Sequence, residues 1–293
     1  MSAEATATAA LGLLGPITEP FQSEFIRTGA AASIIVGVLC GAVGVLVVVR
    51  GMALLADSYA HGVLPGVAIA VLLTTANADP SQIAVLAGGL AGGLVTAAGT
   101  TLILRRSGLK EDTAAAVMFV FMLALGVVLI SRVSNFAVDL TAFLFGDVLS
   151  VDASELPLTA ALAAAVLAAF GLLYRPIVLV SFDRRRAAAA GLRVDRVELA
   201  MMILLAFAVV IGFRVVGALL VLGLLIAPPA AAAMVTRRLP SMIAVSALIA
   251  AVSGPLGLLL SWHLEVAAGA SIVLVAVGIS LLLIALRPRG SLA

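Results

Sequence analysis

Long apolar runs of nearly uniform length recur from one end of this chain to the other. A helix needs about 20 apolar residues to cross the ~30 Å hydrocarbon core of a bilayer. Hydrophobic residues make up 63% of the chain and charged residues only 11%, too few charges to cover a soluble domain. Runs of spanning or near-spanning length fall at 28–49, 52–75, 82–104, 113–131, 156–174, 199–213, 215–234, 240–260 and 267–286. The sequence therefore predicts an all-α membrane protein, a bundle of about nine transmembrane helices.

This bundle accounts for almost the whole chain. Residues 1–25 lack the basic start of a secretory signal, and we interpret them as an N-terminal tail or surface-lying segment. Residues 26–293 are predicted to form one transmembrane domain. Its stretch 132–155 is too short and polar for two spans, and we expect a short re-entrant or surface helix there. Residues 199–234 are expected to form a hairpin or a broken pair of helices.

The basic residues indicate how the bundle sits in its membrane, because cytoplasmic loops carry an excess of Lys and Arg. With an odd number of spans and an outside N-terminus, all 17 Lys and Arg residues fall on the inside except Arg27, Arg132 and Arg214. We therefore predict a cytoplasmic C-terminus. The basic residues are dispersed among spans rather than gathered on one face, so no nucleic-acid partner is expected.

The second apolar run carries an acid and a histidine inside the membrane. Asp57 and His61 are four residues apart and share one face of a helix. Counted from Arg50 at the inner surface, His61 lies about 16 Å deep, near the middle of the bilayer. Ionisable groups at this depth are costly and face a bundle interior, a pathway or a partner. An imidazole and a carboxylate also suit a divalent transition metal.

A structural interpretation of the same pair is about equally favoured. Asp57 and His61 can hold the bundle together by pairing with each other or with a neighbouring helix. Two ligands are also too few for a tight metal site on one chain, although two copies related by a two-fold axis would offer four. Pro65 and Gly66 follow directly and predict a local bend that shapes a pore.

Two further segments stand out. The inner loop at about 175–198 contains SFDRRRAAAAGL, in which charged residues precede an alanine run and a glycine. This pattern predicts a short surface helix that ends at Gly191 and is suited to docking a cytoplasmic partner. An ordinary positively charged cytoplasmic loop would also explain the arginines. In the run 215–234, Pro228 and Pro229 are predicted to break the helix, as a moving segment or as a simple bend.

Several kinds of chemistry are missing from the sequence. The single lysine, Lys110, is not part of a G-x-x-x-x-G-K-[ST] loop, so ATP hydrolysis by that route requires a separate subunit. Cys40 is the only cysteine, which excludes a disulfide framework. No Ser-His-Asp, His-Glu-x-x-His or Cys-x-x-Cys arrangement is present, and His263 is expected in a solvated or interfacial outer loop.

These segments together resemble the permease subunit of the bacterial zinc and manganese ABC importers. That family carries approximately G-D-A-L-S-H-A-V-L-P-G in its second span, and this chain has ADSYAHGVLPG, with Ala60 for the usual serine and Tyr59 for a small apolar residue. The other matches follow in family order: VVRGMALL at 48–55, KEDTAAAVMF at 110–119, FLFGDVLSV at 143–151, SFDRRRAAAAGL at 181–192, VVGALLVLGLLIAPPAAAA at 215–233 and GASIVL at 269–274.

The resemblance implies a transport subunit in the bacterial cell (inner) membrane that is not itself an enzyme. It implies a second permease copy, a cytoplasmic ATP-binding cassette ATPase that uses the ATP, and an extracytoplasmic metal-binding protein. The cargo would be Zn²⁺ first and Mn²⁺ next, with no permanently bound cofactor. Asp57 and His61 would line the metal pathway, and Pro65, Gly66, Pro228 and Pro229 would shape it. The segment 181–192 would couple to the ATPase through Asp183, Arg184, Ala187, Ala190, Gly191 and Leu192.

Two other functions compete with this one. A secondary transporter that works alone on ion gradients is disfavoured because the chain shows no internal repeat and little intramembrane charge. An ABC permease for an iron–siderophore-like cargo would keep the architecture but would not need an Asp/His pair at mid-depth. An intramembrane enzyme is the weakest alternative.

Overall fold

The computed structural model describes residues 19–74, 82–131 and 148–286, and all regular structure in these ranges is helical. Eight helices are long and apolar enough to cross a membrane, and α10 is a shorter apolar helix. The eight long helices and α10 are α2 (Glu24–Arg50), α3 (Ala53–Thr74), α4 (Gln82–Ser107), α5 (Glu111–Ile130), α7 (Leu156–Phe182), α9 (Val194–Val216), α10 (Ala218–Val235), α11 (Leu239–Leu264) and α12 (Ala268–Ala285). The prediction of an all-helical bundle is confirmed, and each predicted apolar run corresponds to one of these helices, although the run 215–234 begins at the end of α9.

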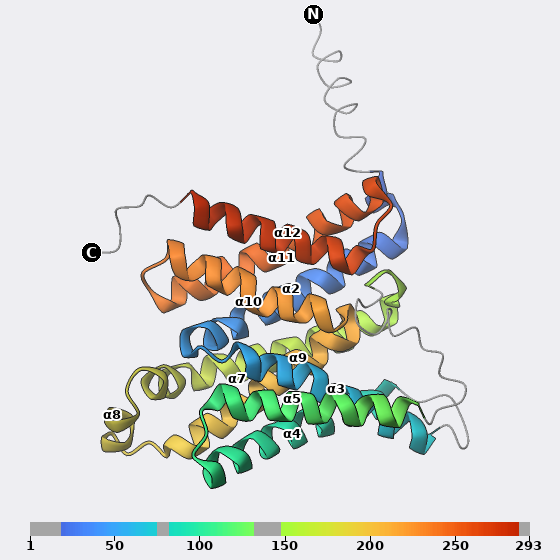
Figure 1. The fold of residues 1–293 in the computed structure, drawn as a ribbon. Helices are drawn as coiled ribbons and strands as arrows, with labels where there is room; N and C mark the ends of the chain where they lie inside the picture. Colours follow the sequence, from blue (N-terminus) through green and yellow to red (C-terminus); the bar gives the residue numbers. More distant parts are fainter. Residues whose placement is uncertain (1–18, 75–81, 132–147, 287–293) are drawn as a thin grey trace, which may run out of the picture.

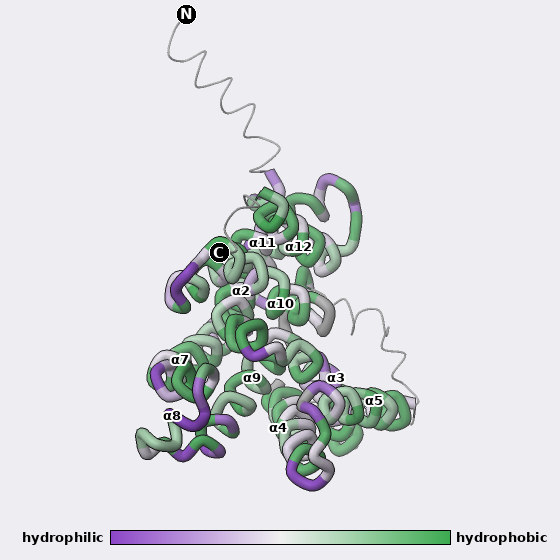
Figure 2. The backbone as a smooth tube through the Cα atoms, turned by 60° about the vertical axis from the view of Figure 1, so that its left-hand side comes forward, coloured by the Kyte–Doolittle hydropathy of each residue, from purple (hydrophilic) through white to green (hydrophobic). Residues whose placement is uncertain are grey.

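The helices form two packed groups that meet at α9. In Figure 1, α3, α4 and α5 lie together at the bottom, and α2, α10, α11 and α12 form the upper part. Helix α9 contacts both groups, and α7 packs beside α2 and α9. The α4–α5 connection, α8 (Arg184–Ala189) and the end of α12 lie at the left end of the bundle, where the predicted cytoplasmic residues gather. Figure 2 shows hydrophobic residues along the helices and hydrophilic ones around α8.

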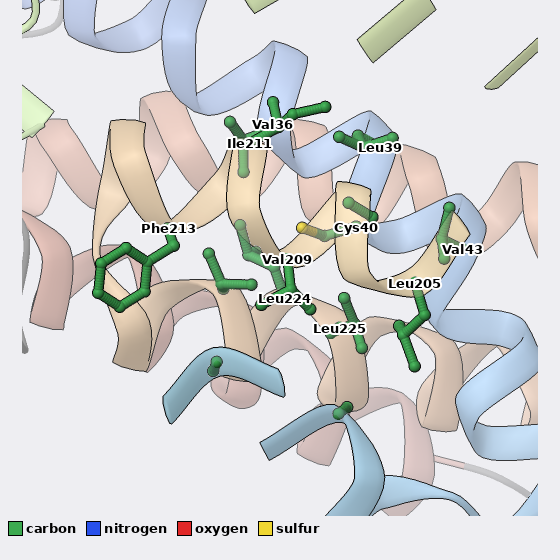
Figure 3. Packing of buried hydrophobic residues seen from close by; sticks show 14 of the residues in the cluster. Val36, Leu39, Cys40, Val43, Leu205, Val209, Ile211, Phe213, Leu224 and Leu225 are labelled. Carbon is green, nitrogen blue, oxygen red and sulfur yellow. The ribbon is translucent and has the colours of Figure 1, made fainter. Parts of the chain in front are cut away.

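Helix α2 is the centre of the larger group. Val36, Leu39, Cys40 and Val43 have no exposed surface, and Figure 3 shows them facing apolar side chains of α9 and α10. Glycines let α2 approach α11 closely: a Cβ on Gly41 would lie 2.8 Å from the Ser246 carbonyl oxygen. Such small-residue contacts replace the hydrophobic driving force, which is weak between helices in lipid.

Several boundaries differ from the sequence prediction. Helix α7 continues past the run 156–174 to Phe182, with Pro176 inside it, so the connection to α9 covers only residues 183–193 instead of about 175–198. Helix α2 begins at Glu24, just inside the predicted tail. Of the stretch 132–155, residues 132–147 lie outside the described part, and the rest contains the 3₁₀ turns η2 (Val148–Ser150) and η3 (Ala153–Glu155). A further 3₁₀ turn, η1 (Pro20–Gln22), precedes α2.

The prediction that Pro228 and Pro229 break a helix is wrong. Helix α10 runs through both prolines to Val235, and the interruption lies at Gly217, between α9 and α10. A proline removes the amide that would bond the carbonyl four residues earlier, which for Pro229 is that of Leu225. Helix α2 lies against this carbonyl, because a Cβ on Gly44 would overlap the Leu225 oxygen. The carbonyl that Pro229 leaves without its helical donor is thus covered by α2.

Candidate functional site

Asp57 and His61 lie on one face of α3 and contact each other. The His61 Nδ1 atom is 3.3 Å from Asp57 Oδ1 and 3.1 Å from the Asp57 carbonyl oxygen. The side chains are half-buried, with 17% of His61 and 29% of Asp57 exposed. Both contacts use Nδ1, and Nε2 makes no hydrogen bond to the described residues. The predicted shared face is confirmed, and it leaves one imidazole nitrogen and carboxylate oxygens available to an ion.

Helix α5 holds this face of α3 in position. The His61 ring meets the Phe119 ring edge-on, with centroids 4.7 Å apart at 80°. One turn away, the buried Ser58 hydroxyl donates to the Ala115 carbonyl oxygen across 2.9 Å. Ala114 and Ala115 are completely buried, and their small side chains allow α3 to come this close. The imidazole is therefore fixed on one side by a carboxylate and on another by an aromatic ring.

The opposite face of α3 packs on α4 through glycines. A Cβ on Gly62 would overlap the Thr96 hydroxyl, and one on Gly66 would overlap the Gly88 carbonyl oxygen. Pro65 lies inside the continuous helix and, having no amide hydrogen, leaves the His61 carbonyl without its donor four residues ahead. Pro65 and Gly66 thus lie one turn beyond His61, within a buried helix contact.

Asp57 and His61 have no third candidate metal ligand beside them in the part of the chain that the structure describes. Within the described residues, no group of three or more His, Cys, Asp or Glu side chains comes together to hold a metal. Cys40 is buried in the core of α2. His263 lies in the last turn of α11 rather than in a loop, because that helix continues to Leu264, and its side chain is exposed as predicted. A site with more than two protein ligands of these types would need residues from another chain or from the undescribed segments.

The predicted short surface helix is present as α8, and Gly191 ends it as the sequence indicated, whereas the cap at its start was not predicted. Asp183 caps it by accepting a hydrogen bond from the Arg186 amide at 2.9 Å. Gly191 follows the helix with φ of 80°, and the Leu192 amide returns to the Ala187 carbonyl oxygen at 3.0 Å. Ala187 is buried and Ala190 is exposed. The helix is thus a compact turn on the surface between α7 and α9.

Sequence reasoning missed an ion-pair group beside α8. The Glu198 carboxylate, in the second turn of α9, lies 3.2 Å from Arg50 Nη2 and 2.6 Å from Arg184 Nη2. Arg50 and Arg184 counted only as inside charges in the sequence, and Glu198 received no role. A glutamate that follows a run of arginines was the one available signal.

Comparison with known proteins places the chain in a family. Residues 22–287 match the ABC 3 transport family. The chain belongs to this family. It is 37% identical over 253 residues to the manganese transport system membrane protein MntC of Halalkalibacterium halodurans, covering 86% of this chain and 84% of that protein. It is 33% identical over 263 residues to the chelated iron transport system membrane protein YfeD of Yersinia pestis, covering 90% and 86%.

Solved structures agree with this assignment. PsaBC from Streptococcus pneumoniae in complex with Fab contains a chain that superposes with a TM-score of 0.83 at 33% identity, covering 94% of this ABC 3 chain and 97% of the other. A putative metal-chelate type ABC transporter in an inward-facing conformation gives a TM-score of 0.69 at 17% identity and shares the fold. The predicted family is thus confirmed. This ABC 3 chain is a multi-pass membrane permease subunit, which sets aside the stand-alone secondary transporter and the enzyme.

Proposed function

We propose that this permease subunit forms the translocation pathway of an ATP-driven importer of divalent transition metal ions. The observation that carries the proposal is the Asp57–His61 pair, whose side chains lie 3.3 Å apart on a helix that is predicted to span the membrane. The pair is only half-buried, so an ion can reach it. Relatives that are named for manganese and chelated iron transport support the same class of cargo.

The pathway is formed by two copies of the chain. One copy offers a carboxylate and an imidazole, and a second copy related by a two-fold axis raises the number of side-chain ligands to four. The site binds weakly, because an ion held too tightly could not leave. In this arrangement the N-terminus lies outside and the C-terminus in the cytoplasm, as the basic residues predict.

Carboxylate and imidazole ligands suit manganese, iron and zinc alike. The imidazole favours zinc in the sequence analysis, whereas the relatives described above are named for manganese and iron.

An extracytoplasmic binding protein delivers the ion. ATP-driven closure of the partner ATPase moves α8, through Asp183, Arg184, Ala187, Ala190, Gly191 and Leu192, and switches the pathway between outward and inward openings. Pro65, Gly66, Pro228 and Pro229 shape the helices that line it.

Uptake into vesicles tests this proposal. The complex of permease, ATPase and binding protein is supplied with ATP and radioactive manganese, iron or zinc, and wild type is compared with Asp57→Ala/His61→Ala. We expect the uptake of one or more ions to collapse in the double variant, with assembly intact. The control is His263→Ala/Asp195→Ala, which removes the chain's other histidine and another acid, both exposed, and uptake should persist.

A chelated-metal cargo is the second candidate, favoured by the relative that is named for chelated iron transport. A large chelate carries its own ligands and would not need the pair. Asp57→Ala/His61→Ala would then leave uptake of the chelate unchanged. Absence of uptake of any free ion by the wild-type complex would contradict the main proposal.

A further inference from the structure

Three charged side chains connect the predicted coupling helix to the end of α2, which leads directly into α3, the helix that carries Asp57 and His61. Glu198 on α9 binds Arg184, the first residue of α8, with one carboxylate oxygen and Arg50, the last residue of α2, with the other. Arg50 and Glu198 are 13% and 17% exposed, whereas Arg184 is 62% exposed. We refer to Arg50, Glu198 and Arg184 as the charged triad.

Helix α9 holds Arg50 at two points. The Nη2 atom binds Glu198, and Nη1 lies 3.3 Å from the sulfur of Met201, one turn further along α9. Because Arg50 and Glu198 are largely shielded, solvent and salt screen the attraction of this pair less than that of a surface ion pair. A movement of the first turns of α9 is therefore transmitted to the end of α2.

The end of α2 is joined to α3 by a rigid corner. Gly51 adopts φ of 68°, its amide bonds the Val48 carbonyl oxygen at 3.2 Å, and the Met52 amide bonds the Val47 carbonyl oxygen at 2.8 Å. Met52 is buried, and its own carbonyl accepts the first hydrogen bond of α3, from Ala56. Because this turn is short and hydrogen-bonded, no flexible linker separates α2 from α3. Asp57 follows Arg50 by only seven residues.

Space for movement lies beside this corner. A cavity of about 550 Å³ is lined by all three members of the triad together with Met52, just before α3, and Leu55 of α3. Leu55 and Asp57 lie on different faces of α3, so this cavity is separate from the face that carries the metal-pathway pair. The triad thus borders a cavity that lies beside α8 and between the starts of α3 and α9.

We propose that Glu198 is a positioning residue that links α8 to α3, so that movement of the coupling helix is converted into movement of the Asp57–His61 face. This role rests on the proposed function of α8 as the contact to the ATPase. It does not depend on which ion is carried. Glu198 touches no transported ion; it acts through Arg50 and Arg184.

The experiment measures coupling in the assembled complex with its ATPase and binding protein. Ions imported per ATP hydrolysed are compared for wild type, Glu198→Gln, Glu198→Asp and Arg184→Gln. We expect Glu198→Gln and Arg184→Gln to lower this ratio by about tenfold while ATP hydrolysis continues, and Glu198→Asp to recover much of it. Asp195→Asn and Arg196→Gln are matched controls, because both residues line the same cavity outside the triad, and their ratio should equal that of wild type.

A second readout does not require any metal. In a Cys40→Ala background, a spin label on Leu73→Cys, at the exposed far end of α3, reports the distance between the two copies with and without ATP. We expect the ATP-dependent change in distance to be present in wild type and lost in Glu198→Gln and Arg184→Gln.

The outcomes separate the two proposals. A wild-type complex that imports no ion but shows the ATP-dependent distance change would overturn the proposed cargo. The spin-label distances in the variants would still test the role of Glu198. An unchanged ion-to-ATP ratio and an unchanged distance response in both variants would overturn the role of Glu198. Should Glu198→Gln fail to assemble, Arg184→Gln decides, because Arg184 is exposed and α8 keeps its Asp183 cap.

Discussion

Helix pairs α2–α11 and α3–α4 use the same packing device with different consequences. On α2, a Cβ at Gly37 or Gly41 would lie less than 3 Å from backbone atoms of α11. On α3, Gly62 and Gly66 are also four residues apart, and a Cβ at either position would lie less than 3 Å from atoms of α4. Both pairs rely on small residues that let backbones approach, as expected for helices in lipid.

The difference lies on the other faces of the two helices. The core-facing side of α2 is enclosed, since Val36, Leu39 and Val43 are fully buried by other helices, whereas Ile34 on another side is exposed. Helix α3 keeps one side open, with Leu54 and Leu73 exposed and the Asp57–His61 pair half-buried between them. The glycine pairs alone do not distinguish a structural helix from a pathway helix. The proposal that α3 lines the pathway rests instead on the polarity and exposure of its remaining face.

The largest expected effect is on the enclosed pair. Gly41→Leu places a branched side chain against the α11 backbone, which cannot yield as a flexible side chain can. We expect destabilisation of about 3 kcal/mol or more and a fall in melting temperature of roughly ten degrees, measured by thermal unfolding in detergent. Gly99→Ala is the control, because its Cβ would meet only the flexible Met118 side chain, and it should unfold close to wild type.

Gly66→Ala breaks the corresponding contact of the open pair. The added Cβ would overlap the Gly88 carbonyl oxygen and push α3 away from α4. Overpacking of this kind costs about 1–3 kcal/mol, and because α3 and α4 lie at the edge of the bundle, the protein should still fold. We expect metal uptake per folded molecule to fall in this variant. Uptake that matches wild type would mean that the α3–α4 contact does not set the position of His61.

Two buried serines give a finer test of the same difference. The Ser246 hydroxyl donates to the Gly41 carbonyl oxygen at 2.7 Å, and the Ser58 hydroxyl donates to that of Ala115 at 2.9 Å. Either alanine substitution should cost about 0.6 kcal/mol, the average for such bonds between membrane helices. Uptake per folded molecule should fall only for Ser58→Ala, since this residue adjoins Asp57. Equal uptake in both variants would argue against a special role for the α3–α5 contact.

The smallest expected effect is that of Phe119→Leu. Leucine fills part of the space but loses the edge-on contact with the His61 ring, and such aromatic contacts contribute about 0.5–1.5 kcal/mol. We expect a modest rise in the ion concentration that gives half-maximal uptake, with assembly unchanged. Phe170→Leu removes an aromatic contact with Tyr174 on α7 instead and should leave this concentration unaltered.

Local features of the fold could be predicted from the sequence, whereas long-range ones could not. Apolar runs set the helices, and Gly191 sets the end of α8, because these depend on neighbouring residues. Helix α10 is continuous through its prolines, and no local pattern predicts that α2 lies against the carbonyl that Pro229 leaves without its helical donor. The Arg50–Glu198 pair joins residues 148 positions apart, and no local pattern records it. The roles of Asp57 and His61 remain predictions.

Mixed dimers give the most direct test of the claim that two copies share one metal pathway. Wild-type chains and Asp57→Ala/His61→Ala chains carry different affinity tags. Complexes that contain one chain of each kind are isolated by two successive affinity steps, one for each tag. If each copy supplies half of the ligands, the mixed complex should import metal at well below half of the wild-type rate, close to the rate of the fully substituted complex. A mixed complex that works at half of the wild-type rate would show that each copy has its own pathway and would contradict the account.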